Sequence, residues 1–214
     1  LPNKAAQPTE APTQQAQTAQ AAPTEQPTPE PDLVQQLLEE MTLEQKVGQL
    51  FLVRPDSLDL SQTQDQINDA KADGVTELTD AMRQTLAEYP VGGVVIFGKN
   101  LESPQQITQF LDDLQQASDT PLFTAIDEEG GLVARLANNA AFDLPQYESA
   151  AAVGTSGNPE DARAMGRTIG GYLKEYGFNL DFAPVADVNT NPDNPVIGTR
   201  AFSSEPQTAA DLVG

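Results

Sequence analysis

The sequence predicts an α/β fold in which short parallel strands alternate with helices. Three observations lead to this prediction: apolar runs of strand length recur along the chain, helical patterns with clear starting signals lie between them, and the connections are short. A continuous apolar run is typical of a strand that is buried on both faces. Strands that alternate with helices are typical of a parallel sheet with right-handed crossovers.

The folded part is expected to begin at Asp32. Residues 1–31 contain seven Pro, seven Ala, six Gln and five Thr, and Leu1 is their only large apolar residue. Such a segment cannot bury enough surface to offset the entropy lost on ordering. We therefore predict that residues 1–31 form a disordered linker and that residues 32–214 form the folded part.

Two short helices and a strand are expected first. Asp32 is placed to cap a helix, and Thr42 with Gln45 forms a capping-box pattern for a second one. The first strand is expected over residues 48–53. One face of the first helix carries the apolar residues Leu33, Val34, Leu37, Leu38 and Met41.

Three further strands are expected over residues 91–97, 121–126 and 179–185. Helices are predicted between them: one that ends before Tyr89-Pro90, and one that starts at Ser103-Pro104 with Pro at the first helical position. The clearest helix has Asn158 as its cap and Gly177 as its stop signal. A last helix is expected over residues 207–213.

Two architectures share this rhythm of strands and helices. An open doubly wound sheet usually carries G-x-G-x-x-G after its first strand, whereas Gly92-Gly93 lie at the start of a strand here. A (β/α)8 TIM-type barrel fits better, but it usually needs about 250 residues. With four strands, residues 32–214 are interpreted as the N-terminal part of such a barrel, about four βα units, in a chain expected to be cut at both ends.

Composition excludes several classes of function. The formal net charge of -21 disfavours nucleic acid and anionic membrane surfaces as partners. The chain has no Cys and no His, which excludes thiolate nucleophiles, Ser-His-Asp triads and the commonest transition-metal ligands. No apolar run is long enough to span a bilayer. We expect neither a metal nor an organic cofactor.

Chemistry is expected where the third strand ends. Asp127 follows that strand, and a carboxylate at a strand tip can accept hydrogen bonds from two adjacent sugar hydroxyls. Gly130-Gly131 could let a flat substrate approach the backbone, and Arg135 could brace the carboxylate or donate to the ligand. The alternative is a solvated acidic turn in which the glycines supply positive φ.

The loop after the fourth strand is the second candidate. Two prolines and a glycine hold residues 191–202 in an irregular path, in which Arg200 could serve as a binding group. The alternative is that Arg200 is a surface charge and that Asp187 caps a turn. We reject Glu128 and Glu129 as a catalytic pair, because sequence neighbours on a strand point in different directions.

Five segments together resemble the N-terminal barrel motifs of family-3 glycoside hydrolases, specifically the bacterial β-N-acetylhexosaminidase branch. They are residues 41–50, 91–97, 127–135, 182–189 and 194–202. The resemblance spans residues 32–214. The β-glucosidase branch generally lacks the acid-x-acid-Gly-Gly run of residues 127–131, which favours the hexosaminidase branch.

The resemblance implies a saccharide site. Asp127 would bind ring hydroxyls, and Arg135 and Arg200 would contact the sugar in the −1 subsite. The reaction would be retaining hydrolysis, with an Asp nucleophile and a His-Asp acid/base pair. The resemblance places these groups, and a Lys-His-Phe-Pro-Gly-His segment, after Gly214. No catalytic residue is therefore assigned in this chain, which by itself should bind sugar weakly if at all and should not hydrolyse it.

The expected activity of the full-length protein is removal of terminal β-linked N-acetylglucosamine from peptidoglycan or chitin-type oligosaccharides. A β-linked amino-sugar oligosaccharide is thus the expected partner, and the expected location is outside the cell or tethered to a bacterial surface. Two alternatives stay open: a β-glucosidase-like family-3 hydrolase, and a non-catalytic carbohydrate-binding half-barrel. The sequence makes no prediction of the oligomeric state.

Overall fold

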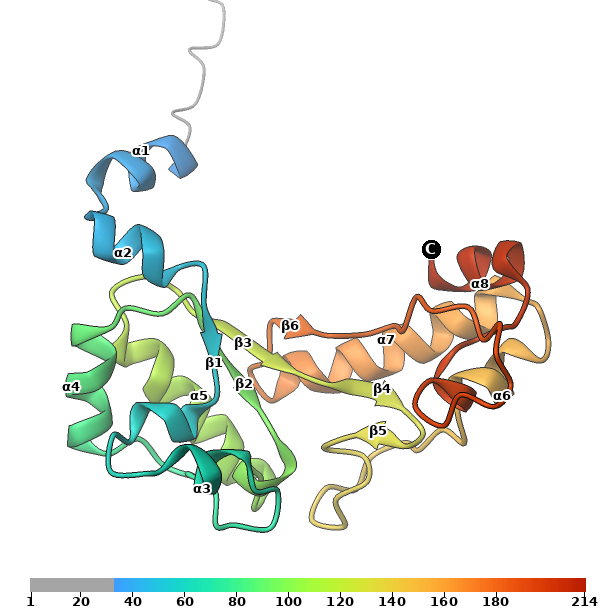
Figure 1. Cartoon of the computed structure of the whole chain (residues 1–214), viewed down its shortest axis with the longest axis horizontal. Coiled ribbons are helices and arrows are strands. Elements are labelled where there is room, and N and C mark those ends of the chain that lie inside the picture. The colour runs from blue at the N-terminus through green and yellow to red at the C-terminus, as the bar shows by residue number, and fades with distance from the viewer. Residues whose placement is uncertain (1–32) are drawn as a thin grey trace, which may run out of the picture.

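The computed structural model describes residues 33–214 (Figure 1). The predicted linker and the proposed cap at Asp32 lie outside these residues. The chain enters through α1 (Leu33–Glu40) and α2 (Leu43–Gly48), and the predicted capping box of Thr42 and Gln45 is present at the start of α2.

A four-stranded parallel sheet forms the centre of the fold. Its strands are β1 (Leu52–Val53), β2 (Gly93–Ile96), β3 (Phe123–Ile126) and β6 (Leu180–Asp181), and they pair in the order β1-β2-β3-β6. All four predicted strands are therefore present, next to one another in chain order.

The strands are shorter than predicted at both edges of the sheet. The first part of the predicted strand 48–53 belongs to the end of α2 and the turn after it. The fourth strand ends at Asp181 instead of residue 185, and Pro184, which has no N–H, cannot continue a ladder.

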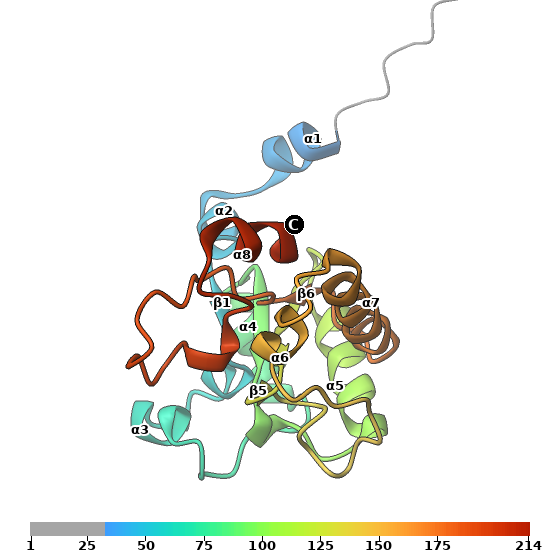
Figure 2. The same ribbon diagram turned by 90° about the vertical axis from the view of Figure 1, so that its right-hand side faces the viewer.

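Four further predicted helices are confirmed, three of them with a side-chain N-cap. They are α4 (Asp80–Glu88) with Thr79 as N-cap, α5 (Pro104–Ala117) with Ser103, α7 (Pro159–Glu175) with Asn158, and α8 (Pro206–Val213). The helices α5 and α7 lie on the same side of the strands (Figure 2). A surface groove lies between α5 and the C-terminal end of α7.

Several short elements were not predicted. Besides α3 (Gln64–Asn68) and α6 (Ala150–Gly154), the chain forms a small antiparallel hairpin of β4 (Glu128–Gly130) and β5 (Val133–Ala134) directly after β3. Three 3-10 turns cover Pro55–Leu58, Gly98–Asn100 and Gly198–Arg200. Elements of two to five residues carry too few positions to show a hydrophobic period.

The predicted burial of every strand on both faces is correct only in the centre of the sheet. Val94, Ile96 and Ile126 are fully buried, together with the inner face of α5. The residues of β1 and β6 are half-buried, and Phe123 of β3 is 52% exposed. Among the described strands, β1 and β6 each have a neighbour on one side only, which explains their greater exposure.

Candidate functional site

The carboxyl ends of the four parallel strands meet at one edge of the sheet. Arg54 directly follows β1, Phe97 follows β2, Asp127 follows β3, and Asp181 is the last residue of β6. In barrels built from βα units, the reactive side chains are placed at this edge. The hairpin that follows β3 adds Arg135 to this edge. Of these five residues, Asp127 and Arg135 were predicted site residues and the other three were not.

The hairpin of β4 and β5 joins Asp127 to Arg135. Asp127 lies before β4 and Arg135 lies after β5, so the two antiparallel strands bring them back together. Arg135 Nη2 donates to Asp127 Oδ2 at 3.0 Å, and the two side chains are 31% and 26% exposed. Arg135 therefore braces the carboxylate, as one of the two sequence interpretations expected.

The two glycines of the hairpin serve its turn. Gly130 and Gly131 have φ values of 82° and 67°, which favour glycine. A Cβ on Gly130 would lie 2.3 Å from Met165 Cε, and one on Gly131 would lie 2.9 Å from Ser149 Cα. The expectation that these glycines leave room for a flat substrate is therefore wrong, because other parts of the protein fill that space.

Phe97 lies between two arginines. The guanidinium carbon of Arg54 is 4.4 Å from the centre of the Phe97 ring, and that of Arg135 is 5.7 Å from it. Sequence analysis assigned neither Phe97 nor Arg54 to the site. Their position directly after the ends of predicted strands was the signal that could have identified them.

Arg200 is held by a distant carboxylate. Its Nε and Nη2 donate to the two oxygens of Glu129 at 2.7 and 2.6 Å, and its Nη1 donates to the carbonyl of Val196 at 3.2 Å. The side chains of Arg200 and Glu129 are 25% and 6% exposed. The interpretation of Arg200 as a plain surface charge is therefore wrong.

Arg200 also lies within the electrostatic reach of Asp127. The hydrogen bond from Arg200 to Glu129 raises the pKa of the guanidinium, and the charges of Glu129, Asp187 and Asp127 raise it further. Through Glu129, Arg200 is attached to the hairpin of β4 and β5, which also joins Asp127 to Arg135. No direct hydrogen bond joins Arg200 to the other two.

Glu128 points to the opposite side from Glu129. It is fully buried and accepts hydrogen bonds from the backbone N–H groups of Leu136 and Ala137 and from the hydroxyl of Tyr172, each at 2.9 Å. Burial and the neighbouring Glu128 raise the pKa of Tyr172, which keeps its proton. The prediction that Glu128 and Glu129 face different directions is confirmed, as the alternation of a strand requires.

Asp181 is a further acid that the sequence analysis did not assign. Its Oδ1 accepts the backbone N–H of Glu128 at 2.9 Å. Burial raises the pKa of Asp181 to about 6, and the charges of Glu128, Asp127 and Glu129 act in the same direction against the lowering effect of that hydrogen bond. The edge thus holds more carboxylates than cations.

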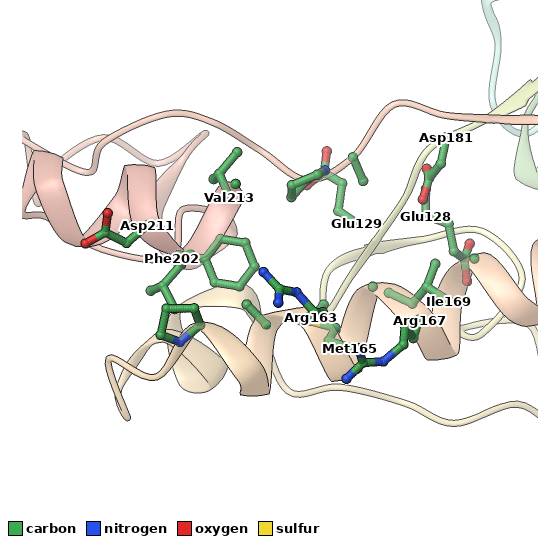
Figure 3. A pocket seen from close by; sticks show the side chains of 18 residues that line it. Glu128, Glu129, Arg163, Met165, Arg167, Ile169, Asp181, Phe202, Asp211 and Val213 are labelled. Atoms are coloured by element: carbon green, nitrogen blue, oxygen red, sulfur yellow. The ribbon is translucent and has the colours of Figure 1, made fainter. Parts of the chain in front are cut away.

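A cavity of about 430 Å³ opens beside this edge, between α7 and α8 (Figure 3). Glu128, Glu129 and Asp181 line one end of it, whereas Asp127, Arg135 and Arg200 do not line it. The apolar lining residues include Met165, Ile169, Phe202, Leu212 and Val213. This cavity is therefore lined by neighbours of the predicted sugar-binding residues and not by those residues themselves.

Residues 33–214 lack two features, a metal-binding cluster and a membrane-spanning helix. This part of the chain holds no group of three or more acidic side chains arranged to bind a metal ion. Within the same residues, no helix has the length and apolar character needed to cross a bilayer. The expected lack of a metal or cofactor stays a prediction.

Known proteins resemble the chain in sequence and in structure. Beta-hexosaminidase A of Pseudoalteromonas piscicida is 36% identical over 143 residues, which are 64% of this chain and 24% of that protein. A family 3 beta-N-acetylglucosaminidase from Paenibacillus sp. superposes with a TM-score of 0.67 at 33% identity, over 81% of this chain and 30% of that one. NagZ from Neisseria gonorrhoeae, solved in complex with N-trifluoroacetyl-D-glucosamine, gives 0.57 at 26% identity, over 65% and 42%.

These similarities confirm the predicted fold class, the N-terminal part of a TIM-type barrel. The chain spans between 24% and 41% of the length of the curated relatives that it matches. The profile of the Glycosyl hydrolase family 3 N terminal domain matches residues 42–214, which include every strand described above. The chain therefore belongs to glycosyl hydrolase family 3.

Proposed function

We propose that the full-length protein removes terminal β-linked N-acetylglucosamine from oligosaccharides, and that this chain supplies part of its sugar-binding surface. Asp127, Arg135 and Arg200 are the proposed contacts in the −1 subsite. The oligosaccharides are proposed to be peptidoglycan fragments or chitin-type oligomers. The relatives named as hexosaminidases, and the relative solved with an amino-sugar analogue, support this class of substrate.

The observation that carries the proposal is the arrangement of opposite charges along the carboxyl edge of the sheet. Asp127 pairs with Arg135, and a carboxylate has two oxygens that can accept hydrogen bonds from two neighbouring hydroxyls. Arg200, from the loop after β6, is held by Glu129 and has N–H groups that Glu129 does not use. Paired acceptors and donors of this kind suit a neutral, hydroxyl-rich ligand.

The proposed contribution of these residues to the reaction is binding and orientation. Hydroxyl contacts that strengthen in an oxocarbenium-like transition state lower the barrier to glycoside hydrolysis. The 214 residues contain no His, and Glu128 and Glu129 bind different partners. We therefore assign neither the proton transfer nor the nucleophilic attack to a residue of this chain. We expect the chain by itself to bind sugar weakly and to leave the glycosidic bond intact.

A substrate comparison tests the proposed function. The full-length protein is assayed with an aryl β-N-acetylglucosaminide and with the matching aryl β-glucoside. We expect kcat/KM to favour the amino sugar by on the order of 100-fold or more, because a site that pairs with the acetamido group leaves polar groups unpaired without it. Preference for the glucoside would support the β-glucosidase alternative. Binding of N-acetylglucosamine without hydrolysis would support the carbohydrate-binding alternative.

The proposed location is outside the cytoplasm, tethered to the cell surface. Its basis is the Pro-, Gln- and Thr-rich composition of residues 1–31, which suits a spacer between an anchor and a folded unit. Fractionation of the producing cells tests this proposal. Recovery of the protein in the cytoplasmic fraction would contradict it.

A further inference from the structure

We infer that Glu129 is a positioning residue for Arg200: it holds the guanidinium in the orientation that serves the sugar and keeps it away from Asp127. The inference rests on the proposed function of Arg200. Glu129 has no assigned role in that function, and the structure gives it one through a contact between residues 71 positions apart.

The two partners differ in how firmly the backbone places them. Glu129 lies on β4, in a hairpin whose neighbouring residue Glu128 is tied to the core by three hydrogen bonds. Arg200 lies at the end of a three-residue 3-10 turn within an irregular loop. Glu129 is therefore the fixed partner, and Arg200 takes its orientation from it.

The hydrogen-bond geometry leaves a defined set of donors for a ligand. A guanidinium has five N–H groups. Two of them bind the oxygens of Glu129, and one binds the carbonyl of Val196. One N–H on Nη1 and one on Nη2 are left to donate to a hydroxyl or a carbonyl of the substrate.

Glu129 also prevents a competing ion pair. Asp127 directly precedes β4, two residues before Glu129, and its charge also raises the pKa of Arg200. Without the bidentate pair, the long side chain of Arg200 could turn toward Asp127, where it would occupy carboxylate oxygens needed for sugar hydroxyls. Because Glu129 is only 6% exposed and binds Arg200 through two charge-assisted bonds, it holds the arginine more strongly than a solvated carboxylate would.

A double-mutant cycle on the full-length protein tests the inference. The variants are Glu129→Gln, Arg200→Ala and the pair together, with kcat and KM measured on an aryl β-N-acetylglucosaminide. We expect Glu129→Gln to lower kcat/KM by roughly 10- to 100-fold, since small displacements of a substrate-positioning group have effects of this size. In the Arg200→Ala background the same change should cost less than about threefold, because Glu129 then has nothing to orient.

Two results of this cycle distinguish failure of the inference from failure of the proposed function. If the losses from Glu129→Gln and Arg200→Ala multiply in the double variant, Glu129 acts independently of Arg200 and the inference is overturned. If Arg200→Ala alone leaves kcat/KM unchanged, Arg200 does not contact the sugar, and the proposed function fails together with the inference. Glu160→Gln is the matched control, since Glu160 pairs with Arg163 on the exposed surface, at a side-chain exposure of 63%.

A second measurement reports on the ion pair without any activity. In nuclear magnetic resonance spectra, the Nε–H of Arg200, identified by its loss in Arg200→Lys, should exchange slowly with solvent in the wild type. Exchange should accelerate at least tenfold in Glu129→Gln and stay slow in Glu160→Gln. Equal exchange rates in the wild type and Glu129→Gln would overturn the inference. If circular dichroism shows that Glu129→Gln does not fold, Glu129→Asp is measured in its place. Its carboxylate is on a shorter side chain, so we expect an exchange rate between those of the wild type and of an unpaired arginine.

Discussion

Two clusters of charged residues follow strands of the same sheet. One is closed, which means buried and fully paired, and the other is open to solvent. The first joins Asp56, which follows β1, to Lys99 and Asn100, which follow β2. Asp56 is fully buried and accepts hydrogen bonds from Val75 N–H and Asn100 Nδ2, with Lys99 Nζ at 3.2 Å. Lys99 is 6% exposed and donates to two backbone carbonyls.

The second cluster follows β3 and β6 and is open. It contains the acids Asp127, Glu128, Glu129 and Asp181 and the cations Arg135 and Arg200. Asp127 and both arginines are between a quarter and a third exposed. One acid of this cluster, Asp181, has a raised pKa because it is partly buried among other carboxylates.

The comparison separates a structural role from a binding role. In the cluster of Asp56, charge is balanced and the donors are satisfied inside the protein, so nothing is left for a ligand. In the cluster of Asp127, negative charge is in excess and polar atoms reach the surface. Excess charge and exposed hydrogen-bonding capacity are the features expected of a binding site.

The largest effect is expected for Asp127→Ala in the open cluster. In the full-length protein we expect kcat/KM for an aryl β-N-acetylglucosaminide to fall by about 1,000-fold, because contacts to ring hydroxyls strengthen in the transition state. The melting temperature should change little, since a partly exposed pair contributes about 0–1 kcal/mol to stability. Wild-type turnover in this variant would remove Asp127 from the site.

The next effect is expected in the closed cluster. Lys99→Met should lower the free energy of unfolding by about 3 kcal/mol, because it leaves the buried Asp56 without its cation. Denaturant unfolding measures this loss. The exposed Lys71→Met is the control and should change stability by less than about 0.5 kcal/mol. Equal stabilities of Lys99→Met and Lys71→Met would show that the closed cluster is not structural.

A smaller effect is expected from the titration of Asp181. Its pKa is raised to about 6 in the folded protein from an ordinary value of 3.8, so the folded state holds the proton more tightly than the unfolded state does. Its ionisation therefore lowers stability as pH rises from about 4 to about 6, and the stability returns when pH falls.

Asp181→Asn tests this sign. The amide oxygen can still accept the N–H of Glu128, but the group no longer ionises. We expect the melting temperature to exceed that of the wild type by about 2 °C at pH 7, with solvent screening included, and to match it at pH 4. Melting curves at both pH values measure the difference. Parallel profiles for the two proteins would contradict the assigned titration.

The smallest effect is expected outside both clusters. Deletion of residues 1–31 should leave the melting temperature within about 1 °C of the full-length value, since this segment has almost no apolar surface to bury. A large drop would indicate that the segment packs against the folded part. Kinetic constants for the aryl glycoside should also be unchanged.

Much of the fold follows from local patterns. Caps at Thr42, Ser103 and Asn158 predicted where helices begin, because a side-chain oxygen that accepts a helical N–H is a local event. The ends of the edge strands were predicted less well. Their length depends on which neighbour is available for pairing, and an apolar run such as residues 48–53 does not reveal that.

The site divides in the same way. The sequence by itself determined which chemistry is available: carboxylates and arginines without any histidine or cysteine, with Asp127 and Arg135 as candidates on either side of two glycines. The structure decided that Arg135 braces Asp127. Only the tertiary structure decided that Glu129 binds Arg200 and that Asp181 lies buried among other acids. These contacts join residues more than 50 positions apart, and they depend on strand register and on the face to which each side chain points, which neighbouring residues do not specify.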